Sequence, residues 1–483
     1  MNIRKPLILV LGAMLLVLGG GMYLPVLADL QVGNEDWHAF ALSGFITIFC
    51  GGTLTSMGWG SSPDFSRRDA LAVTVLAWII LPLFASIPLV LGALNMSITD
   101  ALFESMSGLT TTGATVLSGL DHMPPGILLW RAMLNWIGGI GILATAVAIL
   151  PALQVGGLEI FRIEFTANMT KVLPRIGELS AWIISIYLGL TISCMVCYAL
   201  AGMGGFDALV HALTTVSTGG FSSSDYSMGR YVDNINIQLL CMVFMLSGAL
   251  PFLAYIQLLR GNARAIFEDP QVRALLVILT LLIVTMTVVL SHQSDNTLIK
   301  SFILAGVNII SIMTGTGYSN DDFDQWGSGA TLLFLAMIFV GGCAGSTCCG
   351  VKIFRYQIVF AHLQVQVQRL IYPSGVFEAR YAGKKIEDRT TRSVFAFMLV
   401  FFSTYAISAT ALSLVGLDPI TAISGAATTL ANVGPGVGPV IGPSGNFSTI
   451  PDLGKWIMTA TMYAGRLEII TILAYVMAVT SRH

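Results

Sequence analysis

Thr111-Thr112-Gly113-Ala114-Thr115 is the first of four short segments on which the fold of this chain depends. The pattern returns as Ser217-Thr218-Gly219-Gly220-Phe221, Gly315-Thr316-Gly317-Tyr318-Ser319 and Asn432-Val433-Gly434-Pro435-Gly436. With Gly113, Gly219, Gly317 and Gly434 as the central glycines, the spacings are 106, 98 and 117 residues. A single string of this kind is typical of a tight turn. Four copies at near-equal spacing, each after a short apolar stretch and before a longer one, indicate an internal repeat.

The composition places these segments in a membrane protein. Of the 483 residues 55% are hydrophobic and 10% are charged, and the mean hydropathy is +0.80, whereas soluble domains carry roughly 25% charged residues. Apolar stretches of the ~20 residues needed to cross hydrocarbon recur along the chain. They predict ten spanning helices, at 6–28, 39–63, 70–99, 132–158, 179–206, 234–259, 274–294, 325–351, 393–417 and 453–481. Shorter apolar stretches near 100–112, 206–218, 301–316 and 418–433 are predicted to be re-entrant.

The basic residues fix the orientation of these spans. With ten spans, 19 of the 24 Lys and Arg residues fall on the side of both termini, including Arg162, Lys171 and Arg175. Four fall on the other side and one, Arg466, lies within a span. The positive-inside rule then predicts that both termini are cytoplasmic. The acidic residues lean outward, which would raise the cation concentration at an outer mouth.

Non-helical backbone at membrane depth gives the repeats a chemical meaning. Such backbone is tolerated only around a water- or ion-filled cavity, and carbonyl oxygens without other partners suit a dehydrated alkali cation. Glycine lets successive carbonyls share one axis, and the short helices direct the negative ends of their dipoles at the centre. The predicted cation-binding residues are Thr111, Thr112, Gly113, Ser217, Thr218, Gly219, Gly220, Gly315, Thr316, Gly317, Asn432, Val433 and Gly434.

These patterns predict an all-α integral membrane protein with four helix–pore-helix–helix units around one pore and two extra N-terminal helices. The expected division is an N-terminal two-helix extension at 1–63, repeat 1 at 64–178, repeat 2 at 179–268, repeat 3 at 269–390 and repeat 4 at 391–483. Repeat 3 contains a glycine-rich stretch, Val340-Gly341-Gly342-Cys343-Ala344-Gly345-Ser346-Thr347-Cys348-Cys349-Gly350. Small residues can serve close helix packing, but so many glycines also disfavour a continuous helix.

Arg466 and Glu468 are charges that fall well inside the predicted span 453–481. Intramembrane charges are costly and indicate function. Two residues apart on a helix, they point to different faces, so we do not expect them to pair with each other. Lys352, just after the glycine-rich stretch, can be explained as a lysine that snorkels to the membrane edge.

The four segments resemble degenerate versions of the T-V-G-Y-G filter of potassium channels, placed on one chain. The whole pattern resembles the Trk/Ktr/HKT superfamily of K⁺ transporters. The two helices at 6–63 and the string Phe103-Glu104-Ser105-Met106-Ser107-Gly108-Leu109-Thr110-Thr111-Thr112-Gly113-Ala114-Thr115 make it similar to the bacterial Trk-system potassium uptake proteins TrkH and TrkG. Members that conduct Na⁺ often have Ser at the first filter glycine, so Gly113 favours K⁺.

This resemblance implies a gate below the filter and a set of partners. It implies an intramembrane gating loop that contains Gly342, Cys343, Ala344, Gly345, Ser346 and Thr347. Arg466, in a Gly-Arg-Leu-Glu string similar to that of the family's last helix, would act as an electrostatic barrier. The expected setting is the bacterial inner membrane, with K⁺ as the transported ion, no organic cofactor and no nucleic-acid partner. A homodimer and a TrkA-like cytosolic nucleotide-binding regulator are implied, and the basic stretch from Lys352 to Arg392 could bind that regulator or anionic lipid.

Other function classes fit less well. A Ktr-type Na⁺-dependent K⁺ transporter would lack the two N-terminal helices, and a coupled transporter of organic solutes should show two inverted halves. A receptor or scaffold would not need four copies of a carbonyl-lined loop. The sequence has no G-x-x-x-x-G-K-[ST] string and no Ser/His/Asp cluster or paired carboxylates in an aqueous pocket, so we do not expect an enzyme.

Overall fold

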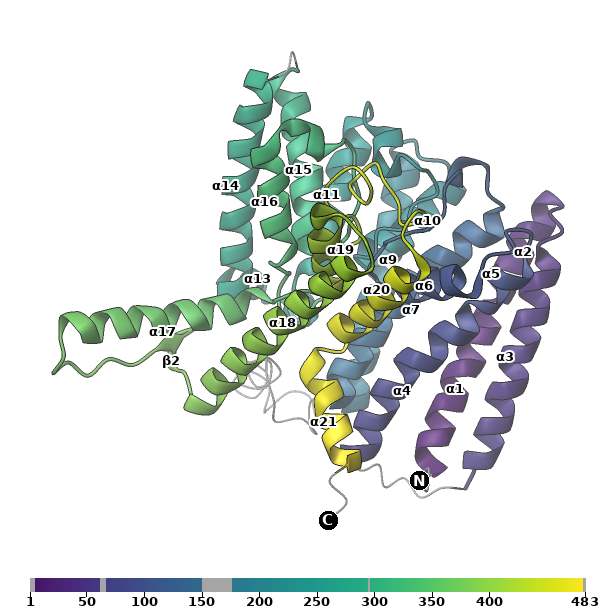
Figure 1. Ribbon diagram of the computed structural model, residues 1–483, viewed down its shortest axis with the longest axis horizontal. Helices are drawn as coiled ribbons and strands as arrows, with labels where there is room; N and C mark the ends of the chain where they lie inside the picture. The colour runs from purple at the N-terminus through teal and green to yellow at the C-terminus, as the bar shows by residue number, and fades with distance from the viewer. Residues whose placement is uncertain (1–4, 61–66, 150–175, 294–295, 481–483) are drawn as a thin grey trace.

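The computed structural model describes residues 5–60, 67–149, 176–293 and 296–480. Within these ranges nearly all regular structure is α-helical (Figure 1). The one sheet found there is an antiparallel pair, β1 (Arg380–Tyr381) and β2 (Lys384–Lys385). The predicted all-α fold class is confirmed.

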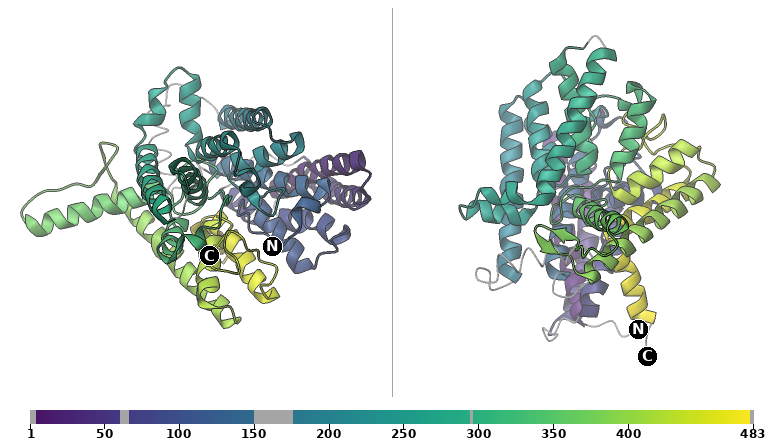
Figure 2. Two further views of the ribbon diagram at one scale, coloured as in Figure 1. Left: turned by 90° about the horizontal axis from the view of Figure 1, so that it is seen from above. Right: turned by 90° about the vertical axis from the view of Figure 1, so that its left-hand side faces the viewer.

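Two helical segments precede the repeats. The first consists of α1 (Lys5–Gly21) and α2 (Tyr23–Val32), which together form one candidate span, and the second is α3 (Trp37–Gly58). Glycines allow α1 and α3 to pack closely, because a Cβ on Gly12 or Gly51 would lie within 3.0 Å of the other helix's backbone. Seen from above, this purple pair lies at the edge of the molecule (Figure 2).

The remaining elements occur four times in the same order: a long helix, a short buried helix, a non-helical segment and a second helix. The first unit has α4 (Arg67–Ala85), α5 (Ile87–Leu91), α6 (Ile98–Leu109), η1 (Leu120–His122) and α7 (Pro125–Ile149). The second has α9 (Ile176–Leu200), α10 (Gly205–Val216), η2 (Ser227–Tyr231), α11 (Ile235–Ala249), α12 (Phe252–Leu259) and α13 (Arg264–Glu268). The third has α14 (Pro270–Gln293), α15 (Leu298–Thr314), η3 (Phe323–Trp326), α16 (Ser328–Ile338) and α17 (Ile353–Ile371). The fourth has α18 (Asp388–Leu414), α19 (Pro419–Ala431), α20 (Asp452–Arg466) and α21 (Ile469–Thr480).

The short helices α6, α10, α15 and α19 occupy the four stretches predicted to be re-entrant. They have 12, 12, 17 and 13 residues, and at 1.5 Å per residue each is shorter than the ~30 Å hydrocarbon core. Three of them begin at a side-chain cap that accepts a backbone N–H bond, with Ser97, Thr297 and Asp418 as the N-cap residues. We call these four helices the pore helices.

The spans are less regular than the ten that the sequence predicts. Six continuous candidates satisfy length and hydropathy in the described residues, and two more are pairs bent by 98° (α11–α12) and 91° (α20–α21). The predicted spans 234–259, 325–351 and 453–481 are therefore broken. A hydropathy profile does not detect these breaks, because the residues at the breaks are themselves apolar. The predicted span 132–158 continues beyond the described residues after Ile149, where Arg162, Lys171 and Arg175 also lie.

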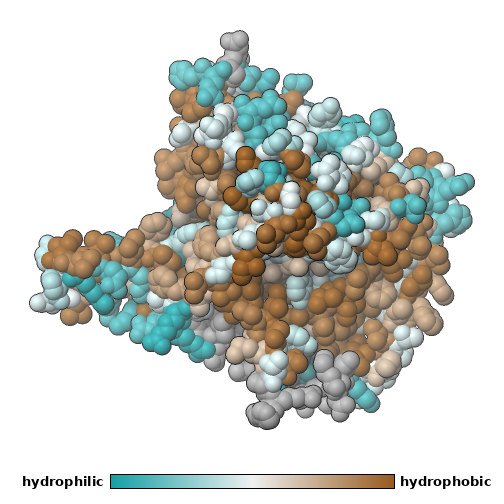
Figure 3. Space-filling view, viewed as in Figure 1, coloured by the Kyte–Doolittle hydropathy of each residue, from teal (hydrophilic) through white to brown (hydrophobic). Residues whose placement is uncertain are grey.

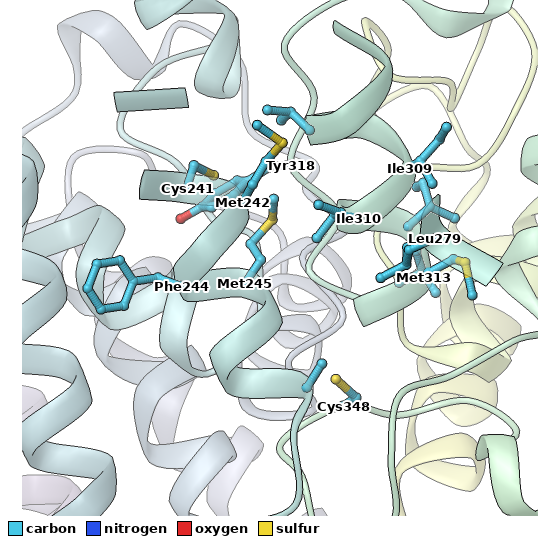
Figure 4. Close-up of a cluster of buried hydrophobic side chains, with 14 of the residues drawn as sticks. Cys241, Met242, Phe244, Met245, Leu279, Ile309, Ile310, Met313, Tyr318 and Cys348 are labelled. Carbon is cyan, nitrogen blue, oxygen red and sulfur yellow. The ribbon is translucent and has the colours of Figure 1, made fainter. Parts of the chain in front are cut away.

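The largest apolar core lies between the second and third units. Met242, Met245 and Met313 are buried there together with Tyr318 and Cys348 (Figure 4). Methionine is flexible enough to fill irregular gaps between helices that are not straight. On the outside, large apolar side chains cover much of the surface in Figure 3, and hydrophilic side chains gather along the upper edge. This distribution fits a body surrounded by lipid.

The stretch from Lys352 to Arg392, expected as a long loop, is mostly helical. α17 projects sideways from the body, and the β1–β2 hairpin returns the chain to α18 (Figure 1). Exposed apolar side chains remain along this arm, among them Phe360, Leu363 and Leu370.

Candidate cation-binding site

The four glycine segments meet, each against the next, in a closed ring. A Cβ added to a central glycine would lie within 3.0 Å of a carbonyl oxygen in the following unit, closer than real Cβ atoms approach. Around the ring these pairs are Gly113 with Gly219, Gly220 with Thr316, Gly317 with Val433, and Gly434 with Thr112. Segments about a hundred residues apart in sequence thus place their backbones side by side, with no room for side chains between them.

The structure corrects the register of the second segment. Its glycine in the position of Gly113 is Gly220, one residue after the predicted Gly219. Gly220 has a positive φ of 74°, as Gly113, Gly317 and Gly434 have 79°, 80° and 108°. Gly219 instead packs against the side chain of Asn135. The sequence could not decide between two adjacent glycines, because either one satisfies the pattern.

Two residues before each central glycine, the backbone is again left-handed. The φ values there are 52° at Thr111, 52° at Thr218, 71° at Gly315 and 54° at Asn432. A positive φ is rare for a β-branched residue such as threonine. Such strain persists only where the surroundings impose it, and it gathers at functional sites.

Polar side chains tie neighbouring segments together. The amide nitrogen of Asn432 donates to the hydroxyl of Thr112 at 2.9 Å, which links the fourth unit to the first. The hydroxyl of Tyr318, in the third unit, lies 2.5 Å from that of Thr214 on α10. These bonds link the fourth segment to the first and the third unit to the second.

The structure brings the predicted cation-binding residues together, with one at the margin. All are buried or half-buried. Ser217 is the C-cap of α10, and its hydroxyl donates back to the carbonyl of Thr214 at 3.2 Å, so its side chain faces its own helix.

The glycine-rich stretch of the third unit is a non-helical loop. α16 ends at Ile338 and α17 begins at Ile353. The loop fits into the break between α11 and α12, where Cys343 N–H donates to the carbonyl of Ala249 at 3.2 Å and Phe252 N–H donates to that of Gly345 at 2.9 Å. These bonds satisfy backbone groups that the broken helices leave without partners at membrane depth.

Thr347 brings this loop against the ring. Its hydroxyl lies 3.2 Å from that of Thr218 and donates to the carbonyl of Gly248 at 2.9 Å. The loop therefore touches the second segment directly.

Arg466 joins the first segment to the same loop. Its guanidinium donates to the hydroxyl of Thr111 at 2.8 Å and to the carbonyl of Gly138 at 2.7 Å. It also lies 2.6 Å from the sulfur of Cys349. The side chain is 2% exposed, and no acidic group pairs with it among the described residues. A buried cation without a counter-ion thus lies at the junction of ring and loop.

Glu468 has a different partner, as its spacing from Arg466 predicts. It lies at the bend between α20 and α21 with a φ of 51°, and its carboxylate accepts a bond from Arg355 of α17 at 2.7 Å. Lys352 turns back to the carbonyl of Cys348 in place of reaching toward the membrane edge.

Sequence reasoning missed a buried ion pair behind the first segment. Arg131 of α7 and Glu104 of α6 lie 2.7 Å apart and are 1% and 0% exposed. The prediction began the span at 132 and treated Arg131 as a loop residue, whereas α7 begins at Pro125. A glutamate within the apolar stretch near 100–112 was the available signal.

Known proteins share the sequence pattern and the fold of this chain. The family described as "TrkH: Cation transport protein" matches residues 37–480. The chain belongs to this TrkH family. A crystal structure of the potassium transporter TrkH from Vibrio parahaemolyticus matches with a TM-score of 0.90 and 33% identity, over 100% of each chain.

Named relatives extend the TrkH assignment. The Trk system potassium uptake protein TrkI of Halomonas elongata is 43% identical over 97% of this chain and 95% of the relative. The Trk system potassium uptake protein TrkH of Escherichia coli K12 is 33% identical over 96% of each. These matches confirm the predicted family, a multi-pass membrane transporter and not an enzyme.

Proposed function

We propose that this TrkH-family chain conducts K⁺ into the cell through a single pore whose filter is the ring of four glycine segments. The observation that carries the proposal is the closed ring itself. Four backbones with left-handed turns meet, and each central glycine lies against a carbonyl oxygen of the next unit. Carbonyl oxygens so placed can replace the water around an alkali ion, and the C-termini of the pore helices add partial negative charge.

The filter residues in this proposal are the predicted ones, centred on Gly113, Gly220, Gly317 and Gly434. The relatives from Halomonas elongata and Escherichia coli are named as potassium uptake proteins, which supports K⁺ as the ion. Gly113 supports K⁺ further, because Na⁺-conducting members of the superfamily often have Ser at this position.

The gate is the loop from Gly342 to Thr347 together with Arg466. A buried positive charge next to the filter hydroxyl of Thr111 raises the energy of a cation at that point. Because Arg466 also contacts Cys349, a movement of the loop would shift the charge. Gate opening in this scheme is a loop displacement that moves the charge of Arg466 away from the filter.

Orientation and assembly complete the proposal. The chain lies in the bacterial inner membrane with both termini in the cytoplasm; α1 begins and α21 ends on the same side of the body (Figure 1). It divides into the extension 1–63 and repeats at 64–178, 179–268, 269–390 and 391–483. The arm of α17 and the basic hairpin offer a surface for a second copy and for a TrkA-like nucleotide-binding regulator.

A cation flux assay tests this function. Purified protein in proteoliposomes is expected to take up K⁺ and Rb⁺ in preference to Na⁺. Gly113→Ser is expected to lower K⁺ uptake, because its side chain would collide with the carbonyl of Gly219. Uptake that requires Na⁺ would favour a Ktr-type mechanism. Saturable exchange of an organic solute without cation current would overturn the proposal.

A further inference from the structure

One position on the pore helices carries a polar side chain in three of the four units. Glu104, His211 and Asn308 each lie nine residues before the central glycine of their unit, which is Gly113, Gly220 and Gly317, respectively. All three are fully buried, at 0% exposure. This equivalence becomes visible only once the second segment is centred on Gly220.

Each of the three side chains reaches the outer limb of its own filter segment, the two or three residues after the central glycine. Glu104 accepts bonds from the hydroxyl of Thr115 at 2.9 Å and from the N–H of Val116 at 3.0 Å. His211 Nε2 lies 3.1 Å from the hydroxyl of Ser222. Asn308 donates to the side-chain oxygen of Asn320 at 2.6 Å.

The histidine ring has a defined proton arrangement. Its Nδ1 lies 2.8 Å from the carbonyl of Asp207. A carbonyl can only accept, so Nδ1 carries the proton, and in the neutral ring Nε2 accepts from the hydroxyl of Ser222. His211 thus connects the start of its pore helix to the limb.

Two of the limbs are also tied to a neighbouring unit. Arg131, which pairs with Glu104, donates to the carbonyl of Ser222 at 3.0 Å. Asn320, which pairs with Asn308, donates to Gln238 of α11 at 3.0 Å. The limbs of the first and third units are therefore held against the second.

The fourth unit lacks this brace. The residue nine before Gly434 is Gly425, and a Cβ there would meet the side chain of Met458. The neighbouring Ser424 instead donates to the carbonyl of Val437 at 2.9 Å. The fourth limb is thus held at a backbone carbonyl by the hydroxyl of a different pore-helix position, one residue earlier.

We propose that Glu104, His211 and Asn308 are positioning residues that hold the outer limbs of three filter segments at a fixed distance from the pore axis and thereby set the discrimination between K⁺ and Na⁺. They do not touch the ion. The inference rests on the proposed function, because it needs the glycine segments to be the filter. A limb released from its brace lets the carbonyls close around the smaller ion, so selectivity falls while conduction continues.

The test measures the K⁺/Na⁺ permeability ratio of full-length protein in proteoliposomes under bi-ionic gradients. His211→Phe keeps a ring and removes the bond to Ser222. Asn308→Leu keeps a side chain of similar size and removes the bond to Asn320. Each is expected to lower the ratio about fivefold, the factor that one net hydrogen bond represents. His211→Gln, which can reach Ser222, is expected to restore most of the ratio.

Ser301→Ala is the matched control, because Ser301 is equally buried on the pore helix of Asn308 and its hydroxyl has no partner there. A second route, should His211→Phe not fold, is Ser222→Ala, which removes the other end of the bond. Folded brace variants with an unchanged ratio would overturn the inference. A wild-type chain that conducts no K⁺, or conducts K⁺ and Na⁺ equally, would instead overturn the proposed function.

Discussion

The half of this molecule that contains the pore helices and glycine segments, here called the outer half, is regular. The half that contains the ends of the second helices, here called the inner half, is irregular. In the outer half the same arrangement occurs four times: a pore helix, a left-handed turn and a central glycine against the next carbonyl. In the inner half the second helix of each unit differs. α7 is continuous to Ile149, α11 and α12 are bent by 98°, α16 and α17 are separated by a loop, and α20 and α21 are bent by 91°.

The difference follows from the roles proposed for the two halves, an ion filter and a gate. A bare ion needs oxygens on all sides at similar distances, so the segments that supply them must be near-equivalent. A barrier needs only one obstacle that can move, and one loop with one arginine suffices. We therefore expect changes in the outer half to affect selectivity and folding, and changes in the inner half to affect rate alone.

The largest effect is expected from Gly220→Ala. A methyl group there would collide with the carbonyl of Thr316 and would occupy a φ that costs roughly 1–3 kcal/mol for a side chain. We expect K⁺ flux to fall by at least about a hundredfold, because the clash adds to that strain. Gly189→Ala on α9, where a Cβ meets nothing within 4 Å, is the control. Flux retained in Gly220→Ala would remove the ring from the conduction path.

Breaking the ion pair of Glu104 and Arg131 is expected to act on stability. Removal of one partner leaves a buried charge alone, at a cost of about 3–5 kcal/mol. Arg131→Met should lower the thermal midpoint of the detergent-solubilised protein. The double variant Glu104→Gln with Arg131→Met should recover part of the loss, and strict additivity would mean that the two groups do not interact.

The sequence predicts the repeated glycine segments of the outer half better than the helix breaks of the inner half. The repeat revealed Gly113, Gly317 and Gly434, because a backbone requirement leaves a residue-type signature in every copy. It placed the second central glycine at Gly219, whereas the structure has Gly220 in that position. The prediction also placed Arg131 in a loop. Its charge ended the apolar stretch at residue 132, whereas α7 begins at Pro125.

The helix breaks in the inner half have separate local causes, and the sequence predicts only some of them. The loop from Gly341 to Gly350 could be inferred from its glycines. Pro251 favours a break after Leu250. Hydropathy nevertheless predicts one continuous span at 234–259, because the residues on both sides of the break are apolar. Neither proline nor glycine stands at the bend at Glu468, whose carboxylate contacts Arg355 of α17.

Arg466→Gln tests whether the inner half controls rate. Loss of the buried charge next to Thr111 should raise K⁺ flux roughly tenfold, since a barrier change of about 1.4 kcal/mol is small for a charge at this distance. A deletion within 343–349 should also raise it. The K⁺/Na⁺ permeability ratio should stay at the wild-type value. A fall in that ratio would show that the two halves are not separable.

Glu468→Gln is expected to have the smallest effect. The side chain of Glu468 is 44% exposed, whereas that of Arg355 is 1% exposed. The amide oxygen of glutamine can still accept the bond from Arg355, so the buried guanidinium keeps a partner. Arg355 keeps its contact with the ring of Phe397, whose centroid lies 3.5 Å from the guanidinium carbon. We expect K⁺ flux to change by less than about threefold. A rise as large as that of Arg466→Gln would mean that the bend between α20 and α21 is itself the moving part, and that the loop merely follows it.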